Sequence, residues 1–251
     1  MEKRFLFHAQ ATGVSGQITL PFNDLIEAQA ATALPQTGGY STSRVENFSY
    51  KQIVSFRSAT TQTTGSYSAK DEAYNTLVTA TIEKLNILDQ VTADLVVAHL
   101  TSKHPKAGGQ PSIIPLGSHF ENLRIAGRRV DVQVDAETFS KLDTYDHVCA
   151  RLQEDKDWRR ELLQGQEDLT IPPPQNTLLC SIVRSIRPDS SDLKPVGCAI
   201  HVPNFGAVYL GEFLIQPYQR SLTMIRANLG SPVEGHFMAA YISGNGQGYP
   251  P

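Results

Sequence analysis

The sequence predicts an all-β fold, mainly antiparallel, in which repeated hairpins form a barrel or a sandwich; a β-solenoid is the alternative. Three observations carry this prediction. A six-residue pattern recurs at a nearly constant spacing, a turn and a β-branched segment follow each copy, and one charged stretch of helical periodicity interrupts the series. Regular recurrence of a short unit indicates a duplicated supersecondary element. The chain is therefore expected to consist mainly of strand-turn-strand units.

One domain spanning 1–251 is predicted from length and composition. A folded chain of 251 residues buries roughly three quarters of the surface that its unfolded form exposes. Hydrophobic residues make up 40% of the chain and charged residues 19%. These values are ordinary for a globular protein and exclude a disordered or fibrous class.

The repeated pattern consists of an apolar residue, Glu, then Asn or Lys, and two further apolar residues separated by a polar one. The clear copies begin 37 and 38 residues apart, and they are Val45–Tyr50, Ile82–Ile87 and Phe120–Ile125. β-Branched segments start nine or ten residues after the first apolar position, at Val54, Val91 and Val130. Short polar breaks separate the two halves, so each unit is expected to be a hairpin.

The spacing within the unit is irregular for a strand. The first and second apolar residues, such as Ile82 and Leu85, are three positions apart, whereas side chains on one face of a strand recur every second residue. Either both faces are partly buried, or a β-bulge at the Glu-Asn/Lys pair turns all three apolar residues to one face. We favour the bulge, because a bulge repeated in every unit would curve the sheet as barrels and twisted sandwiches require.

The remaining segments are predicted in chain order. Residues 5–20 form strands, and a charged stretch at about 136–166 forms a helical insertion, interrupted near Asp155, because its apolar residues are three, four and seven positions apart. Three prolines at 172–174 end any helix, and a strand resumes over 177–186. A degenerate fourth copy of the repeat lies at Leu210–Ile215, with its Glu displaced by one position. The glycine-rich segment 243–251 is predicted to be a mobile tail.

Charge and cysteine content limit the partners and the compartment. The net charge is −3 and the basic residues are scattered, so no nucleic-acid partner is expected. No run approaches the ~20 apolar residues of a membrane span, and the first residues lack the apolar core of a signal peptide. Cys149, Cys180 and Cys198 show no metal-ligand spacing. Cys180 and Cys198 lie in apolar strand-like runs and could face each other, but buried free thiols are the favoured interpretation. Together these features predict a cytoplasmic protein.

Val91-Thr92-Ala93-Asp94, which follows Leu85-Asn86-Ile87-Leu88, resembles the alternating strands of bacterial surface domains called choice-of-anchor proteins. Ile125–Val130 and Leu222–Ala227 occupy positions where similar segments would fall, so the resemblance covers about half of the chain. It implies a β-rich surface domain and no catalytic residues. The chain differs from those proteins in the insertion at 136–166 and in lacking a secretion signal or an anchor.

His119 and Glu121 form the most specific chemical motif, because a His-x-carboxylate pair on one strand places both side chains on one face. With a distant histidine they would suit a non-haem iron site or acid-base catalysis. Glu121, however, occupies the repeat position that Glu46 and Glu83 fill in the other copies, so the repeat alone explains it. We therefore predict no metal site and no cofactor. The catalytic candidates are His119, Glu121, His201, Glu212 and His236.

Further polar residues lie at predicted strand ends, where they would line the mouth of a pocket for a small apolar ligand. Ordinary loop chemistry is the competing interpretation. The binding candidates are Arg124, Tyr209 and Arg226.

Two functional hypotheses follow. The first is a non-enzymatic binding or structural module that forms homo-oligomers through exposed strand edges. The alternative is a small-molecule enzyme or carrier in which the candidate residues converge on a cavity and use His/Glu acid-base chemistry. The sequence contains no GxSxG, HExxH, P-loop or GxGxxG motif in a suitable context, which favours the first hypothesis.

Overall fold

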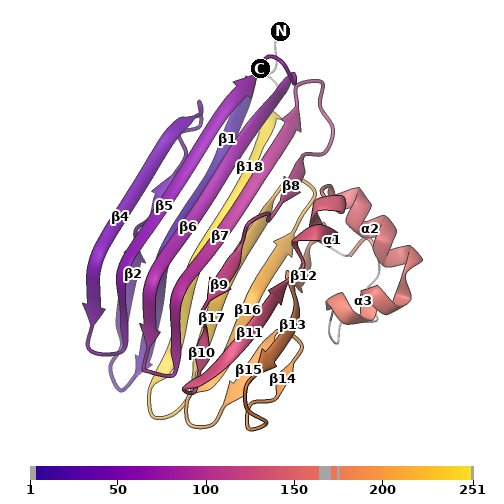
Figure 1. The fold of residues 1–251 in the computed structure, drawn as a ribbon. Helices are drawn as coiled ribbons and strands as arrows, with labels where there is room; N and C mark the ends of the chain where they lie inside the picture. Colours follow the sequence, from indigo (N-terminus) through magenta and orange to yellow (C-terminus); the bar gives the residue numbers. More distant parts are fainter. Residues whose placement is uncertain (1–3, 164–170, 174–175, 250–251) are drawn as a thin grey trace.

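The computed structural model describes residues 4–163, 171–173 and 176–249. Two antiparallel sheets stack face to face as a β-sandwich, and three helices lie against one side of it (Figure 1). The strand pairing of each sheet runs from one edge to another without closing. The all-β prediction with a helical insertion is therefore confirmed. Of the three predicted architectures the sandwich is formed, and the barrel and the solenoid are not.

The first sheet, sheet A, joins the two ends of the described chain, because its central strands β1 and β18 pair along their whole length. In order across the sheet its strands are β14 (Pro195–Val196), β15 (Ala199–Val202), β16 (Gly206–Ile215), β17 (Arg220–Leu229), β18 (Glu234–Tyr249), β1 (Arg4–Leu20) and β2 (Asp24–Gln29), with β12 (Leu178–Ser181) beside β16 and β3 (Thr32–Ala33) beside β1.

Sheet B contains the three clear copies of the repeat. In order across the sheet its strands are β13 (Val183–Pro188), β11 (Arg128–Val134), β10 (Arg124–Ile125), β7 (Val91–Pro105), β6 (Ala73–Ile87), β5 (Val54–Ser68) and β4 (Gly39–Tyr50), with β8 (Ser112–Ile114) and β9 (His119–Glu121) beside β7. The predicted hairpins are β4–β5, β6–β7 and β10–β11. The degenerate fourth copy begins another hairpin, β16–β17, in sheet A.

The helical insertion consists of α1 (Ala136–Lys141), α2 (Tyr145–Glu154) and α3 (Lys156–Leu163). Asp135 and Thr144 cap the first two helices, because their side-chain oxygens accept hydrogen bonds from backbone N–H groups three residues later. The predicted interruption falls at Asp155, between α2 and α3. Residues 164–166 of the predicted insertion lie outside the described residues. Among the residues described, no helix has the length and apolar character needed to span a membrane.

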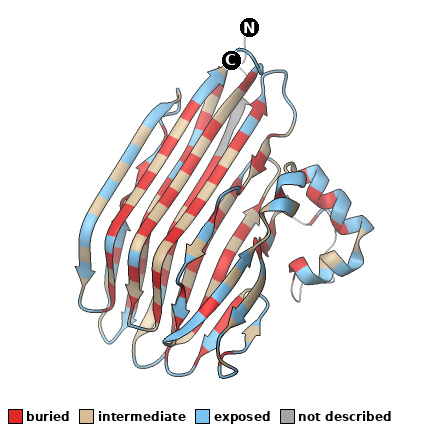
Figure 2. Ribbon diagram, viewed as in Figure 1, coloured by how far each residue is buried: buried red, intermediate tan, exposed pale blue. Residues whose placement is uncertain are grey.

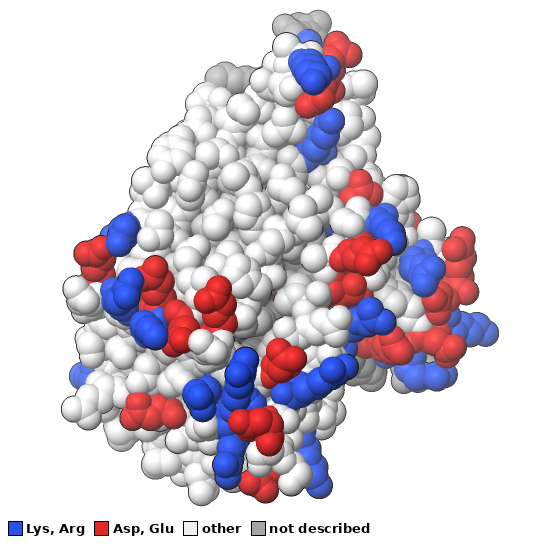
Figure 3. Space-filling model, viewed as in Figure 1, with Lys and Arg blue, Asp and Glu red and all other residues white. Residues whose placement is uncertain are grey.

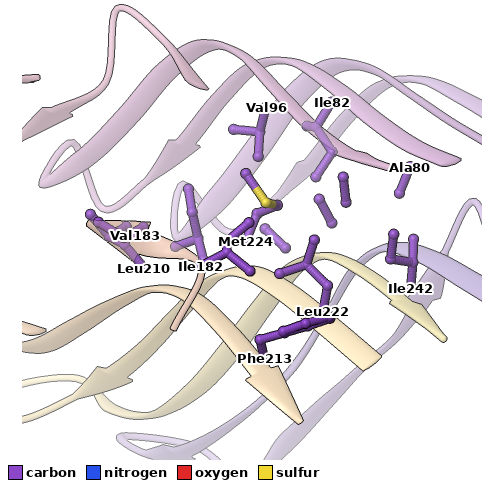
Figure 4. Packing of buried hydrophobic residues seen from close by; sticks show 14 of the residues in the cluster. Ala80, Ile82, Val96, Ile182, Val183, Leu210, Phe213, Leu222, Met224 and Ile242 are labelled. Carbon is purple, nitrogen blue, oxygen red and sulfur yellow. The ribbon is translucent and has the colours of Figure 1, made fainter. Parts of the chain in front are cut away.

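The core fills the space between the two sheets. Buried and more exposed residues alternate along β5, β6 and β7 (Figure 2). Ile82 and Val96 of sheet B face Leu222 and Met224 of sheet A (Figure 4), and all four side chains are fully buried. Phe139 of α1 packs edge-on against Phe213 of β16, with ring centroids 5.3 Å apart, and so docks the helices on sheet A. The interior is a packed apolar core rather than a ligand cavity lined by the candidate residues.

The repeat owes its irregular spacing to a left-handed residue in each copy. Asn47, Lys84 and Asn122 have φ values of 53°, 54° and 48°. Ile82, Leu85 and Ile87 consequently all face the core and are buried. All three apolar residues of this copy therefore lie on one face of the strand, as the bulge hypothesis predicts.

The irregularity differs from a simple bulge in its pairing. Glu83 pairs with Leu95 and Leu85 pairs with Ala93, whereas Lys84 and the facing Asp94 take no part in the ladder. The neighbouring strand therefore skips a residue as well, and the register is the same on both sides of the irregularity. The skipped residues form a line across sheet B, the kink row: Asn47, Arg57, Lys84, Asp94 and Asn122.

Sheet A has comparable left-handed residues: Gly211 in β16 and Ala240 in β18, with Ala30 between β2 and β3. Their φ values are 63°, 53° and 51°. Leu210 and Glu212 on either side of Gly211 keep one register with β17. The displaced Glu of the fourth copy thus follows the kink instead of preceding it. Left-handed residues therefore interrupt the alternation of strands in both sheets.

Lys84→Asn should leave the free energy of unfolding within about 0.5 kcal/mol of the wild type. Asn stands at this position in the first and third copies and enters the left-handed region readily. Lys84→Val should lower the free energy of unfolding by about 1–2 kcal/mol, because a β-branched side chain resists positive φ. Urea denaturation measures both variants, and equal stabilities would contradict the strain argument.

The C-terminal segment differs from its prediction. Residues 243–249, expected to be a mobile tail, form the last part of β18 and pair with residues 4–10 of β1. The glycines in this segment recur at every second position, and they pair with Phe5, Phe7 and Ala9. Period two is the periodicity of a strand face, so these glycines share one face of β18.

Candidate functional site

The eight candidate residues fall into two groups on opposite sides of the sandwich. His201, Tyr209, Glu212, Arg226 and His236 belong to strands of sheet A, whereas His119, Glu121 and Arg124 belong to strands of sheet B. Each group lies on the outer surface of its sheet, and the filled core separates them. The cavity that the enzyme hypothesis requires, with the two groups converging, is therefore not formed.

Arg226 is the centre of the best-organised polar cluster. Its Nε and Nη2 both donate to the Glu212 carboxylate at 2.6 Å, and Nη1 donates to Asn228 Oδ1 at 3.0 Å. The guanidinium lies over the Tyr209 ring, 3.8 Å from its centroid. Strand register explains these contacts, because Tyr209 of β16 pairs directly with Arg226 of β17. The side chains of Glu212 and Arg226 are only 13% and 28% exposed.

The electrostatics of this cluster are internally satisfied. The hydrogen bonds to Glu212 raise the pKa of Arg226 above its usual value. Burial raises the pKa of the nearby Cys198 thiol, and the charge of Glu212 raises it further. Cys198 is thus kept protonated, which makes it a poor nucleophile. Both hydrogen bonds from Arg226 to the Glu212 carboxylate are charge-assisted, so the two side chains are bound to each other.

The two histidines on sheet A do not join this cluster as a catalytic group. His201 of β15 pairs with Ala207 of β16, and His236 of β18 pairs with Asn228 of β17. Three strand spacings therefore separate the two histidines, which amounts to about 14 Å. Both side chains are exposed.

On sheet B the His-x-Glu motif is a surface pair. His119 Nε2 lies 3.7 Å from Glu121 Oε1, and both side chains are about half exposed. The equivalent glutamates are also ion-paired at the surface: Glu46 with Arg44 at 2.6 Å and Glu83 with Arg57 at 2.7 Å. The interpretation of Glu121 as a repeat residue is supported, because all three glutamates have the same structural role.

A cleft of about 450 Å³ adjoins the kink row on sheet B, and it is lined by Lys84, Leu85, Thr92, Ala93, Asp94, Asn122 and Arg124. Lys84 Nζ and Asn122 Nδ2 donate to Asp94 at 2.7 and 2.8 Å. These two hydrogen bonds lower the pKa of Asp94. Charged side chains cross the lower part of this face as a band and form a second group at its upper end, while the area between them is uncharged (Figure 3). The cleft is open to solvent, and its lining carries two positive side chains, Lys84 and Arg124, and one carboxylate, Asp94.

No three His, Cys, Asp or Glu side chains of the described residues gather closely enough to hold a metal ion. Cys198 is partly buried, and Cys149 and Cys180 are buried free thiols. The free-thiol prediction is confirmed for Cys149 and Cys180.

Sequence reasoning missed Arg220, the largest fully buried side chain of the described chain. It begins β17 and donates from Nη1 to the Ile113 carbonyl at 2.7 Å and from Nη2 to the Leu142 carbonyl at 2.8 Å. It therefore connects sheet A, sheet B and the end of α1. Its sequence neighbours are polar turn residues, so no local signal indicated burial.

The comparisons place the chain in a family. No curated protein and no solved structure matches it. The family model described as a domain of unknown function (DUF8256) matches residues 5–169 and, in a second segment, residues 143–216. These segments together extend from residue 5 to residue 216 of the 251, which includes the strands of sheet B and the helical insertion but not β17 and β18 of sheet A. The chain therefore belongs to the DUF8256 family.

Proposed function

We propose that this protein is a non-enzymatic β-sandwich module that acts through assembly with other protein chains. The observation that carries the proposal is the division of the candidate residues between two outer faces by an apolar core. Catalysis needs reactive groups that converge on one substrate. Here the most ordered polar groups, Glu212 and Arg226, bind each other.

The surface also supports an assembly role. The outer face of sheet B carries an uncharged area above the band of ion pairs (Figure 3). Sheet edges offer unpaired backbone groups that a further strand can use, and β4 forms one such edge.

Native mass spectrometry combined with chemical cross-linking tests the proposal. The purified protein should give dimers or larger assemblies with defined cross-links between copies. Variants Glu212→Gln and Arg226→Met should assemble as the wild type does, because the proposal gives this ion pair a role only within the sheet. Monomers alone at every concentration would remove the support for assembly.

A relation to choice-of-anchor surface domains and a cytoplasmic location are two further proposals, and they differ in the compartment that each implies. The segments that carry the resemblance lie in strands, at the start of β7, in β10–β11 and in β17, which supports a shared β architecture. The free thiols support a reducing compartment. Cell fractionation with an antibody to the native chain separates the two, because a surface domain would be found outside the cytoplasm.

A further inference from the structure

β4 is a long strand with one partner. Its twelve residues, Gly39–Tyr50, pair with β5 and with no other strand in the described part of the chain (Figure 1). The backbone N–H and C=O groups on its outer side are therefore available to another strand. An edge of this kind is a template for β-strand addition.

The other sheet edges have features that hinder strand addition. β14 is two residues long and contains Pro195, and β13 ends at Pro188. β2 pairs with β1 through a register shift. β4 contains no proline and no lysine, and it is regular from residue 39 to residue 46, before the left-handed Asn47. Proline, charge and irregularity are the usual protections of an edge, so β4 is the least protected of these edges.

The charges on β4 do not oppose a second copy of the chain. Arg44 and Glu46 neutralise each other through a 2.6 Å ion pair on the outer face. On the inner face Ser41 and Val45 are only half buried. Two strands of sheet A contact β4. Thr32 of the two-residue strand β3 donates a 2.6 Å hydrogen bond to Ser41, and Tyr50 at the end of β4 donates to Asp24 of β2. These contacts use side chains, so they leave the outer backbone edge of β4 without a partner strand in the described part of the chain.

We infer that two copies of this chain join through β4, antiparallel about a two-fold axis, so that sheet B continues from one copy into the other. This inference rests on the proposed assembly function and names its partner and its interface. A two-fold contact uses the same surface on both copies, and β4 offers a neutral edge to its own equivalent.

The sequence of β4 restricts the register. Arg44 or Glu46 at the two-fold axis would place like charges directly opposite, which destabilises a strand pair. With Val45 at the axis, Ser43 would pair with the left-handed Asn47, so regular pairing would extend only over residues 44–46. Ser43 or Thr42 at the axis pairs the regular residues 40–46 or 39–45. With Ser43 at the axis, Tyr40 lies diagonal to Arg44 of the second copy, and with Thr42 at the axis it lies directly opposite. Tyr40 is 58% exposed, so its ring can attract the guanidinium in either register.

The decisive experiment is sedimentation velocity over a concentration series on the wild type, Thr42→Lys and Thr42→Ala. In Thr42→Lys the new ammonium group would lie opposite Arg44 of the second copy if Ser43 is at the axis, and opposite the second copy's own new ammonium group if Thr42 is at the axis. Like charges meet in both registers, so this variant should dimerise at least about tenfold more weakly than the wild type. Thr42→Ala removes the hydrogen bond from Thr42 to the Thr61 carbonyl without adding charge, and it should dimerise within about threefold of the wild type. Circular dichroism checks that each variant is folded.

Cysteine cross-linking then tests the register. Ser43→Cys or Thr42→Cys should form a disulfide between copies under mild oxidation, and Ser66→Cys, an exposed position on β5, should not. Peptide mapping separates the new bond from the native thiols. Cross-linking at neither β4 position would overturn the register. Equal dimerisation of Thr42→Lys and the wild type would overturn the β4 interface but leave the assembly function standing, whereas a wild type that stays monomeric would overturn both.

Discussion

Arg220→Ala should lower the free energy of unfolding by about 3 kcal/mol, one of the two largest losses we expect from a single substitution. The side chain is 1% exposed, and it is the donor to the carbonyls of Ile113 and Leu142. Its removal leaves two buried acceptors without donors, each of which costs about 1–3 kcal/mol. It also opens a cavity beside the Phe213 ring, over which the guanidinium lies.

The charge itself is not the stabilising part of Arg220. Burial lowers the pKa of its guanidinium from the usual value to about 10. Below this pKa the folded and unfolded states are both protonated, and the buried charge is a cost to the folded state. Between the folded pKa and the higher unfolded pKa the unfolded state holds more protons, so this cost diminishes as pH rises. The planar guanidinium with its two hydrogen bonds, rather than the charge, therefore holds the three elements together.

Urea denaturation of Arg220→Ala, with Arg187→Ala as an exposed control on β13, measures this contribution. The control should stay within about 0.5 kcal/mol of the wild type. Arg220→Lys keeps the charge but lacks the planar fork, so it should recover only part of the loss. Amide exchange should accelerate most in residues 136–163, because the helices lose their connection to β17. Full recovery by lysine would show that charge, not geometry, matters.

Much of the fold follows from local patterns. The three-residue step between Ile82 and Leu85 indicates an irregular strand, and the structure gives the reason in the left-handed Lys84. The helical insertion is recognisable because its apolar spacing differs from that of all the flanking segments. Such features need only a few neighbouring residues, and a sequence displays them directly.

The candidate site could not be predicted in the same way, because it depends on which strands share a sheet. His119 and His201 look alike in sequence, as polar residues at strand ends, yet β9 pairs within sheet B and β15 within sheet A. Arg220 is buried only because β8 and the end of α1, about 80 to 110 residues earlier in the chain, supply carbonyl acceptors. Long-range pairing decides both cases, and no local pattern encodes it.

Gly235→Ala should lower the free energy of unfolding by about 3 kcal/mol or more. Gly235 has φ +151°, a region that other residues rarely adopt, and an added Cβ would lie 2.1 Å from the Gln17 carbonyl oxygen. Gly235 pairs with Ile18 of β1 and Leu229 of β17, so the clash would push apart central strands of sheet A. The strand cannot shift alone, because both its neighbours belong to the packed core.

The variant Gly109→Ala distinguishes backbone strain from steric clash as causes of the stability loss expected for Gly235→Ala. Gly109 also has a positive φ, +107°, but no atom lies within 4 Å of the position of an added Cβ. Its substitution should cost only the backbone strain, about 1–2 kcal/mol, and the difference between the two variants measures the clash with β1. Thermal and urea denaturation of both variants supply the comparison. If Gly235→Ala cost no more than Gly109→Ala, the close approach of β18 to β1 would not constrain residue 235, and the strand pairing at that end of sheet A would have to be looser than the structure shows.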